Sequence, residues 1–206
     1  AEHVLNAGCQ LITLGGEHSI SLPLLRAHAA KHGPLALIQF DAHPDLWDEE
    51  YSGHKFSHGT PFRRALDEGL IDPGAFVQIG IRGPTGGPQD YEDARQFGTL
   101  MFSVDDVDQL RIENVLQETH QRIGDRPVYV TFDIDAADPA FAPGTGTPEV
   151  GGFTSRELLR LVRGLRGLNF TGFDLVEVSP AYDNSGITAL LASNLVFEFL
   201  SLLAVR

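Results

Sequence analysis

The sequence predicts an α/β protein built on a mainly parallel sheet. Apolar runs of strand length alternate along the chain with longer segments whose apolar residues recur at helical spacing. Several of the short runs are apolar at consecutive positions, as expected of strands that helices cover on both faces. The 206 residues contain no internal repeat, low-complexity tract or linker, so we expect a single domain over 1–206.

The expected elements follow one another in chain order. Strands are predicted at 10–14, 35–40, 75–81, 128–132 and 170–178, and helices at 19–31, 60–68, 111–123, 155–165 and 187–203. Ser19 and Ser155 are the expected N-caps, and Gly33 and Gly69 stand where helices often end. The segments 41–59 and 135–152 are long for loops of this class, which favours a functional role.

Charge and cysteine content exclude several classes of function. The chain has 15 Lys and Arg against 28 Asp and Glu, a formal net charge of −13, and its most basic stretch, 160–166, is spaced like the outer face of a helix. We therefore expect no nucleic-acid partner. The single cysteine, Cys9, excludes internal disulfides and fits a cytoplasmic location. Glu198 interrupts the apolar stretch 187–205, which favours a packed helix over a membrane span.

Ligand-type side chains follow three of the predicted strands. GGEHS at 15–19 contains His18, DAHPD at 41–45 contains Asp41, His43 and Asp45, and DIDAADP at 133–139 begins with Asp133 and Asp135. In an extended segment, residues two apart project to one side, so the side chains of the second cluster would converge. The carboxyl ends of parallel strands meet at one edge of the sheet, where open α/β folds place their sites.

Each cluster by itself has a simpler interpretation. An Asp-x-Asp sequence after a strand is commonly a turn or a capping device, and an isolated histidine in a loop is commonly hydrogen-bonded. Four carboxylates and two imidazoles at one edge would, however, repel one another unless cations lay between them. Two divalent cations supply that charge, and oxygen and imidazole ligands without thiolate favour manganese over nickel, cobalt or zinc. Such a pair activates water, so the residues alone predict a binuclear metallohydrolase.

The three clusters, in this order, resemble those of the ureohydrolase family of arginases and agmatinases. The third cluster continues as APGTGTP at 142–148 and GG at 151–152, and the similarity covers nearly the whole chain. The resemblance implies a three-layer α/β/α sandwich, hydrolysis of a guanidino compound to urea and an amine, and a homo-oligomer. Compared with the family, the chain lacks an N-terminal strand and helix, and Glu17 stands where many members have Asp.

The resemblance also implies a role for each site residue. His18, Asp41, Asp45 and Asp133 would hold one Mn²⁺, and His43, Asp41, Asp133 and Asp135 the other, so that two ions are expected per chain. Asp45 would in addition orient the attacking hydroxide. His58, in SHG at 57–59, matches the family's proton-shuttle histidine. Glu177, in EVSP at 177–180, matches the glutamate that binds the guanidinium, a planar cation suited to bidentate pairing with a carboxylate.

Within the family, the chain resembles the agmatinase branch. PAYD at 180–183 and ITA at 187–189 are similar to agmatinases, and Gly83, Pro84 and Thr85 stand where arginases place carboxylates that read the α-amino group. Agmatine is therefore the expected substrate, and 4-guanidinobutyrate or another guanidino compound is the alternative. The acidic segment 47–51 would offer negative charge to the ammonium end of agmatine, unless it is only a solvated loop. Arg82 would be the partner of a substrate carboxylate.

Two functions of other classes compete with this interpretation. A non-catalytic truncated or assembly subunit would need no metal, but all six expected ligands are present. A two-metal phosphate esterase would share the ligands, but the motifs have no neighbouring cluster of Arg and Lys to neutralise phosphate.

Overall fold

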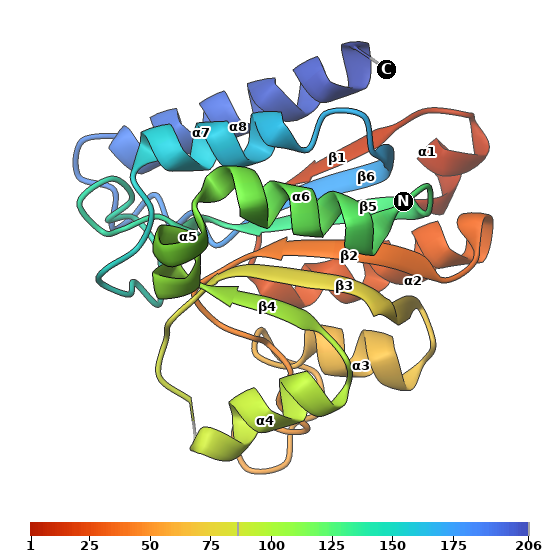
Figure 1. Cartoon of the computed structure of the whole chain (residues 1–206), viewed down its shortest axis with the longest axis horizontal. Helices are drawn as coiled ribbons and strands as arrows, with labels where there is room; N and C mark the ends of the chain where they lie inside the picture. Colours follow the sequence, from red (N-terminus) through yellow and green to blue (C-terminus); the bar gives the residue numbers. More distant parts are fainter. Residues whose placement is uncertain (86, 206) are drawn as a thin grey trace.

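A single sheet of six strands forms the centre of the molecule (Figure 1). The computed structural model describes residues 1–85 and 87–205. All pairings among its strands are parallel, in the order β1-β6-β5-β2-β3-β4. The strands are β1 (Leu11–Leu14), β2 (Leu35–Phe40), β3 (Ile71–Ile81), β4 (Leu100–Ser103), β5 (Pro127–Asp133) and β6 (Asn169–Val176). The predicted mainly parallel α/β fold is thus confirmed.

Helices cover both faces of the sheet and complete the three layers (Figure 1). One face packs against α5 (Val104–Leu110), α6 (Ile112–Ile123), α7 (Ser155–Gly164) and α8 (Ile187–Ala204). The other face packs against α2 (Ser21–His32) and α3 (Pro61–Asp67), and α1 (Glu2–Asn6) contacts α2. The helix α4 (Pro88–Gln96) lies beside the edge strand β4. Two short 3₁₀ helices, η1 (His18–Ile20) and η2 (Ile134–Ala136), follow β1 and β5.

The burial pattern explains why the central strands read as continuous apolar runs. All six residues of β2 are buried, with Ala36, Ile38 and Phe40 on one face and Leu35 and Leu37 on the other. Both faces of such a strand are covered by helices, so alternation between apolar and polar residues is lost.

The strand β4 and the helices α4 and α5 were not predicted, and two predicted caps were wrong. The strand β4 has only four residues, and the helices α4 and α5 are short and acidic, so none has a clear apolar period. The cap of α7 is Thr154 rather than Ser155, because the hydroxyl of Thr154 and the carboxylate of Glu157 form a reciprocal capping box. Ser19 lies inside η1, where Glu17 is the cap.

One face of the C-terminal helix α8 packs on the sheet. Among the described residues it alone has the length and composition to cross a membrane, with a mean hydropathy of 1.8. Its buried residues Leu191, Leu195 and Phe199 belong to the main apolar core. Glu198 lies beside α7, where it accepts a hydrogen bond from Arg163 at 2.6 Å. The helix therefore packs by one face and carries a paired glutamate, as expected from Glu198 in its sequence.

A buried histidine on α2 is expected to make stability depend on pH. The ring of His28 is fully buried, 4.9 Å from the ring of Tyr129, and neither ring nitrogen has a hydrogen-bond partner in the described structure. Burial, with the like charges of His32 and Lys31, lowers its pKa to about 4. The folded protein therefore holds the neutral ring, and its stability should fall as the pH drops from about 6.5 toward 4.

Replacing His28 by Leu should remove this contribution. The free energy of unfolding is measured in urea at pH 7 and at pH 4.5. Between these two pH values it should fall by up to about 3 kcal/mol more in the wild type than in the variant. His3→Gln, on the exposed surface of α1, is the matched control and should behave as the wild type. Equal losses in all three proteins would contradict the prediction.

Candidate functional site

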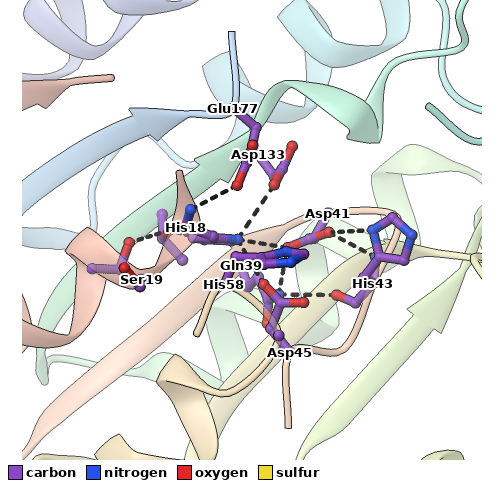
Figure 2. A network of polar contacts seen from close by, with 12 residues as sticks. His18, Ser19, Gln39, Asp41, His43, Asp45, His58, Asp133 and Glu177 are labelled. Carbon is purple, nitrogen blue, oxygen red and sulfur yellow. Dashed lines mark hydrogen bonds and ion pairs between the residues drawn. The ribbon is translucent and has the colours of Figure 1, made fainter. Parts of the chain in front are cut away.

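The carboxyl ends of four neighbouring strands bring the expected site residues together (Figure 2). His18 lies in η1 after β1, and Glu177 follows β6. The remaining ligand candidates follow β2 and β5: Asp41, His43, Asp45, Asp133 and Asp135. The backbone of both Asp45 and Glu177 is left-handed, with φ of 52° and 64°. Such strained conformations are concentrated at functional sites, where the surrounding structure holds them.

The imidazole of His18 points one nitrogen at three carboxylates. Its Nδ1 lies 2.8 Å from an oxygen of Asp45, 3.1 Å from one of Asp41 and 3.4 Å from one of Asp133. Its Nε2 lies 2.8 Å from the hydroxyl of Thr131. The ring is 1% exposed, so the imidazole itself is buried.

A second cluster forms around His43 on the other side of Asp41. The Nδ1 of His43 lies 3.0 Å from an oxygen of Asp135 and 3.6 Å from the second oxygen of Asp41. The backbone N–H of Ala42 donates to the other oxygen of Asp135 at 2.9 Å. A Cβ on Gly83 would lie 2.4 Å from the His43 ring, so only glycine leaves room for the imidazole.

The two clusters have the geometry of a pair of cation sites that share one carboxylate. In each of two groups, His18 with Asp41 and Asp133, and His43 with Asp41 and Asp135, the potential ligand atoms lie within 4.8 Å of one another. Asp41 belongs to both groups and directs one oxygen to each imidazole. Hard carboxylate oxygens combined with imidazole nitrogen suit first-row divalent metals.

The carboxylates of the site oppose one another's ionisation. Burial and the charge of Asp41 raise the pKa of Asp45 to about 7, and burial with neighbouring carboxylates raises the pKa values of Asp133 and Asp135. Burial would lower the pKa of His43, but Asp135 and Asp41 outweigh it and raise the pKa to about 12. Positive charge is thus strongly favoured among these side chains, which is the electrostatic requirement for binding cations.

A row of buried polar side chains lies beneath the two clusters. Its members are aligned in register across four adjacent strands, on the face covered by α2 and α3: Gln78, Gln39, Thr131 and Asp174. Gln39 donates to Asp41 at 2.7 Å and Gln78 donates to the side-chain oxygen of Gln39 at 2.7 Å. We did not predict this polar row. Its signal was available, because Gln39 and Thr131 each stand two residues before a ligand aspartate within an apolar strand.

A cavity of about 290 Å³ opens over the two clusters. Glu177 and His58 both line it, together with Glu50, Tyr51 and Glu149. Burial raises the pKa of Glu177, and one of its carboxylate oxygens accepts the backbone N–H of His18 at 2.8 Å. The Nε2 of His58 lies 2.6 Å from the hydroxyl of Tyr51, and His58 belongs to neither group of metal-ligand candidates.

Comparisons with known proteins identify the family of the chain. The model of the Arginase family matches residues 1–201. The chain belongs to the arginase family. It is 48% identical over 98% of its length to a mitochondrial agmatinase of Gallus gallus, and 50% identical over 97% to a mitochondrial guanidino acid hydrolase of Homo sapiens. It spans only 59% and 56% of those two relatives.

A solved structure of the arginase family shows the same fold. Proclavaminate amidino hydrolase from Streptomyces clavuligerus superimposes with a TM-score of 0.89 at 47% identity, covering 93% of this chain and 63% of that one. The expected three-layer architecture of the family is thereby confirmed.

The expected substrate partner Arg82 lies outside the cavity, whereas the acidic segment 47–51 contributes Glu50 to it. Arg82 does not face the cavity, because its guanidinium donates to backbone carbonyls of Gly80, Asp135, Ala137, Glu149 and Val150. It therefore holds the 135–150 segment in place. In the acidic segment 47–51, Asp48 forms an ion pair with Arg64 at 2.6 Å and lies outside the cavity, while Glu50 lines it. The structure adds Glu149, which lies 3.7 Å from Nε2 of His43.

Proposed function

We propose that the protein hydrolyses a guanidino compound to urea and an amine, using two divalent metal ions. The observation that carries this proposal is the pair of ligand clusters sharing Asp41 directly beneath a cavity that also contains Glu177 and His58. The names of the relatives, agmatinase and guanidino acid hydrolase, support the same reaction class.

The residues of the site fit two manganese ions. The buried Nδ1 of His18 has no hydrogen-bond partner in the described structure, although three carboxylates surround it. The proposed ligands of one ion are His18, Asp41, Asp45 and Asp133, and those of the other are His43, Asp41, Asp133 and Asp135. When bound, such a pair lowers the pKa of water and so supplies a nucleophile at neutral pH.

Side chains around the cavity would perform the other parts of the reaction. Glu177 can accept two N–H groups of a guanidinium and so fix the plane of the substrate above the metal-ligand clusters. A guanidinium carbon made tetrahedral by attack can release its amine only after the departing nitrogen gains a proton. His58 is the proposed donor, and Tyr51 holds its ring by the 2.6 Å contact between hydroxyl and Nε2.

The charge of the cavity favours agmatine as the substrate. Among the described residues, neither lysine nor arginine lines the cavity, whereas Glu50 and Glu149 do. A free ammonium group would therefore meet negative charge, and a substrate carboxylate would find no cationic side chain in this wall. The name guanidino acid hydrolase keeps 4-guanidinobutyrate and related acids as the second candidates.

Urea release is the test of this function. The protein, loaded with manganese, should release urea from agmatine faster than from 4-guanidinobutyrate or arginine. Preference for 4-guanidinobutyrate would keep the reaction class and overturn the substrate. Absence of both bound metal and urea release would instead favour the non-catalytic assembly subunit, the competing proposal.

A single charge change should separate the candidate substrates. We expect Glu149→Gln to lower kcat/KM for agmatine about tenfold, because the substitution removes negative charge from the cavity. The kcat/KM for 4-guanidinobutyrate should stay unchanged or rise. Asp48→Asn is the matched control, since its carboxylate is paired with Arg64 outside the cavity, and both kcat/KM values should stay unchanged. An equal loss for both substrates in Glu149→Gln would argue against a charge effect.

We further propose a cytoplasmic homo-oligomer with no membrane or nucleic-acid partner. The single cysteine, Cys9, supports this location, although two eukaryotic relatives are named mitochondrial. We also propose that residues 1–206 form a single domain.

A further inference from the structure

The two histidines of the site differ in what their outer nitrogens contact. Nε2 of His43 faces the substrate cavity, with the carboxylate of Glu149 at 3.7 Å. Nε2 of His18 faces the interior and lies 2.8 Å from the hydroxyl of Thr131. The same hydroxyl lies 2.6 Å from an oxygen of Asp174. His18 is thus connected to a buried carboxylate through a single hydroxyl, and His43 is not.

The chemistry of Asp174 gives this connection a direction. Asp174 is fully buried and accepts hydrogen bonds from three hydroxyls: Thr131 at 2.6 Å, Ser21 at 2.8 Å and Tyr129 at 2.9 Å. Burial raises the pKa of Asp174, and the hydrogen bonds from the three hydroxyls oppose that shift. The Thr131 hydroxyl has one proton, which it donates to Asp174. The hydroxyl oxygen can then only accept from His18. An imidazole that binds a metal ion through Nδ1 would then keep its one proton on Nε2, where the Thr131 oxygen accepts it.

We propose that Asp174 is a positioning residue that, through Thr131, fixes His18 in the tautomer able to bind a metal ion. With the proton on Nε2, the lone pair of Nδ1 points at Asp41, Asp45 and Asp133. If the hydrogen bonds ran in the opposite direction, Thr131 would donate to Nε2 of His18. The imidazole proton would then be on Nδ1, the nitrogen that is proposed to bind the metal ion. This inference rests on the metal centre proposed above, and it concerns only the ion that His18 would bind.

Strand register places the residues of this hydrogen-bonded series next to one another. Asp174 and Thr131 are register partners on the adjacent strands β6 and β5, and they project to the same face. Thr131 stands two residues before Asp133, so one strand supplies both a ligand and the support of another ligand. The side chains of His18, Thr131 and Asp174 are buried, so bulk water cannot replace a missing hydrogen bond between them.

Metal affinity tests the proposal without relying on turnover. Manganese binding is measured by EPR of the free ion, and bound metal is counted by elemental analysis. Thr131→Val and Asp174→Asn should each raise the Kd of one of two ions at least about tenfold and leave the other within about twofold. Thr131→Ser keeps the hydroxyl and should retain the wild-type affinity. In a His18→Ala background, Asp174→Asn should have no further effect on the remaining ion.

Tyr129→Phe is the matched control for loss of packing. It removes a hydrogen bond of similar length to Asp174 but leaves the Thr131 link intact. It should lower the Tm of the metal-free protein and leave both Kd values unchanged. Wild-type affinity in Thr131→Val and Asp174→Asn, or equal weakening of both ions, would overturn the inference while leaving the metal centre standing. A wild-type protein that binds no manganese would overturn the metal centre and the inference together.

Discussion

Replacing Asp41 by Asn should empty both metal sites and lower kcat by about 10³-fold or more. Asp41 belongs to both ligand clusters, with one carboxylate oxygen 3.1 Å from Nδ1 of His18 and the other 3.6 Å from Nδ1 of His43. An amide has one oxygen and no charge, so it cannot serve two cations. A loss of 10³-fold corresponds to about 4 kcal/mol, within the range expected for removal of metal-ion catalysis.

The control for this variant is Asp138, an aspartate of the DIDAADP segment at 133–139 with a structural role. Asp138 accepts backbone N–H groups of Ala140, Gly151 and Gly152 and contacts none of the ligand candidates. Asp138→Asn should lower the Tm because it weakens these charge-assisted hydrogen bonds, yet it should keep two manganese ions per chain. Elemental analysis and urea release, measured side by side, check both variants. Two bound ions in Asp41→Asn would contradict the shared-carboxylate geometry.

Replacing Glu177 by Gln should separate substrate binding from metal binding. The carboxylate lines the cavity and is the proposed partner of the guanidinium, so its neutral amide would lose a charge-assisted pair. Truncating one partner of such a pair costs about 2–5 kcal/mol, so kcat/KM should fall by about 10²-fold or more. The manganese content should stay at the wild-type value, because Glu177 is not among the proposed ligands.

Glu17→Gln is the comparison for the Glu177 variant. Glu17 lies in the same region of the site, but its carboxylate caps η1 by accepting the backbone N–H of Ser19. We expect little change in kcat/KM from this substitution. If Glu177→Gln instead lost metal in proportion to activity, Glu177 would be a determinant of metal binding and its assignment to the guanidinium would be wrong.

Several features of the fold could be predicted because they depend on local pattern. The central strands are apolar on both faces, so their sequence alone indicates a covered parallel sheet. The short strand β4 and the helices α4 and α5 were missed because tertiary packing at the sheet edge, not apolar period, decides their conformation. The cap at Thr154 could have been found from Glu157 three residues later.

The residues of the candidate site could be proposed from the sequence. Ligand-type side chains at strand ends, together with the parallel connection of the strands, predict that His18, Asp41 and Asp133 lie at one edge of the sheet. Which side chains reach the cavity, and which support others, follows from the tertiary structure. Arg82 is held by backbone carbonyls, Asp48 is paired with Arg64, and Asp174 lies beneath His18. These roles depend on register and burial between segments far apart in the chain, which local residue patterns do not encode.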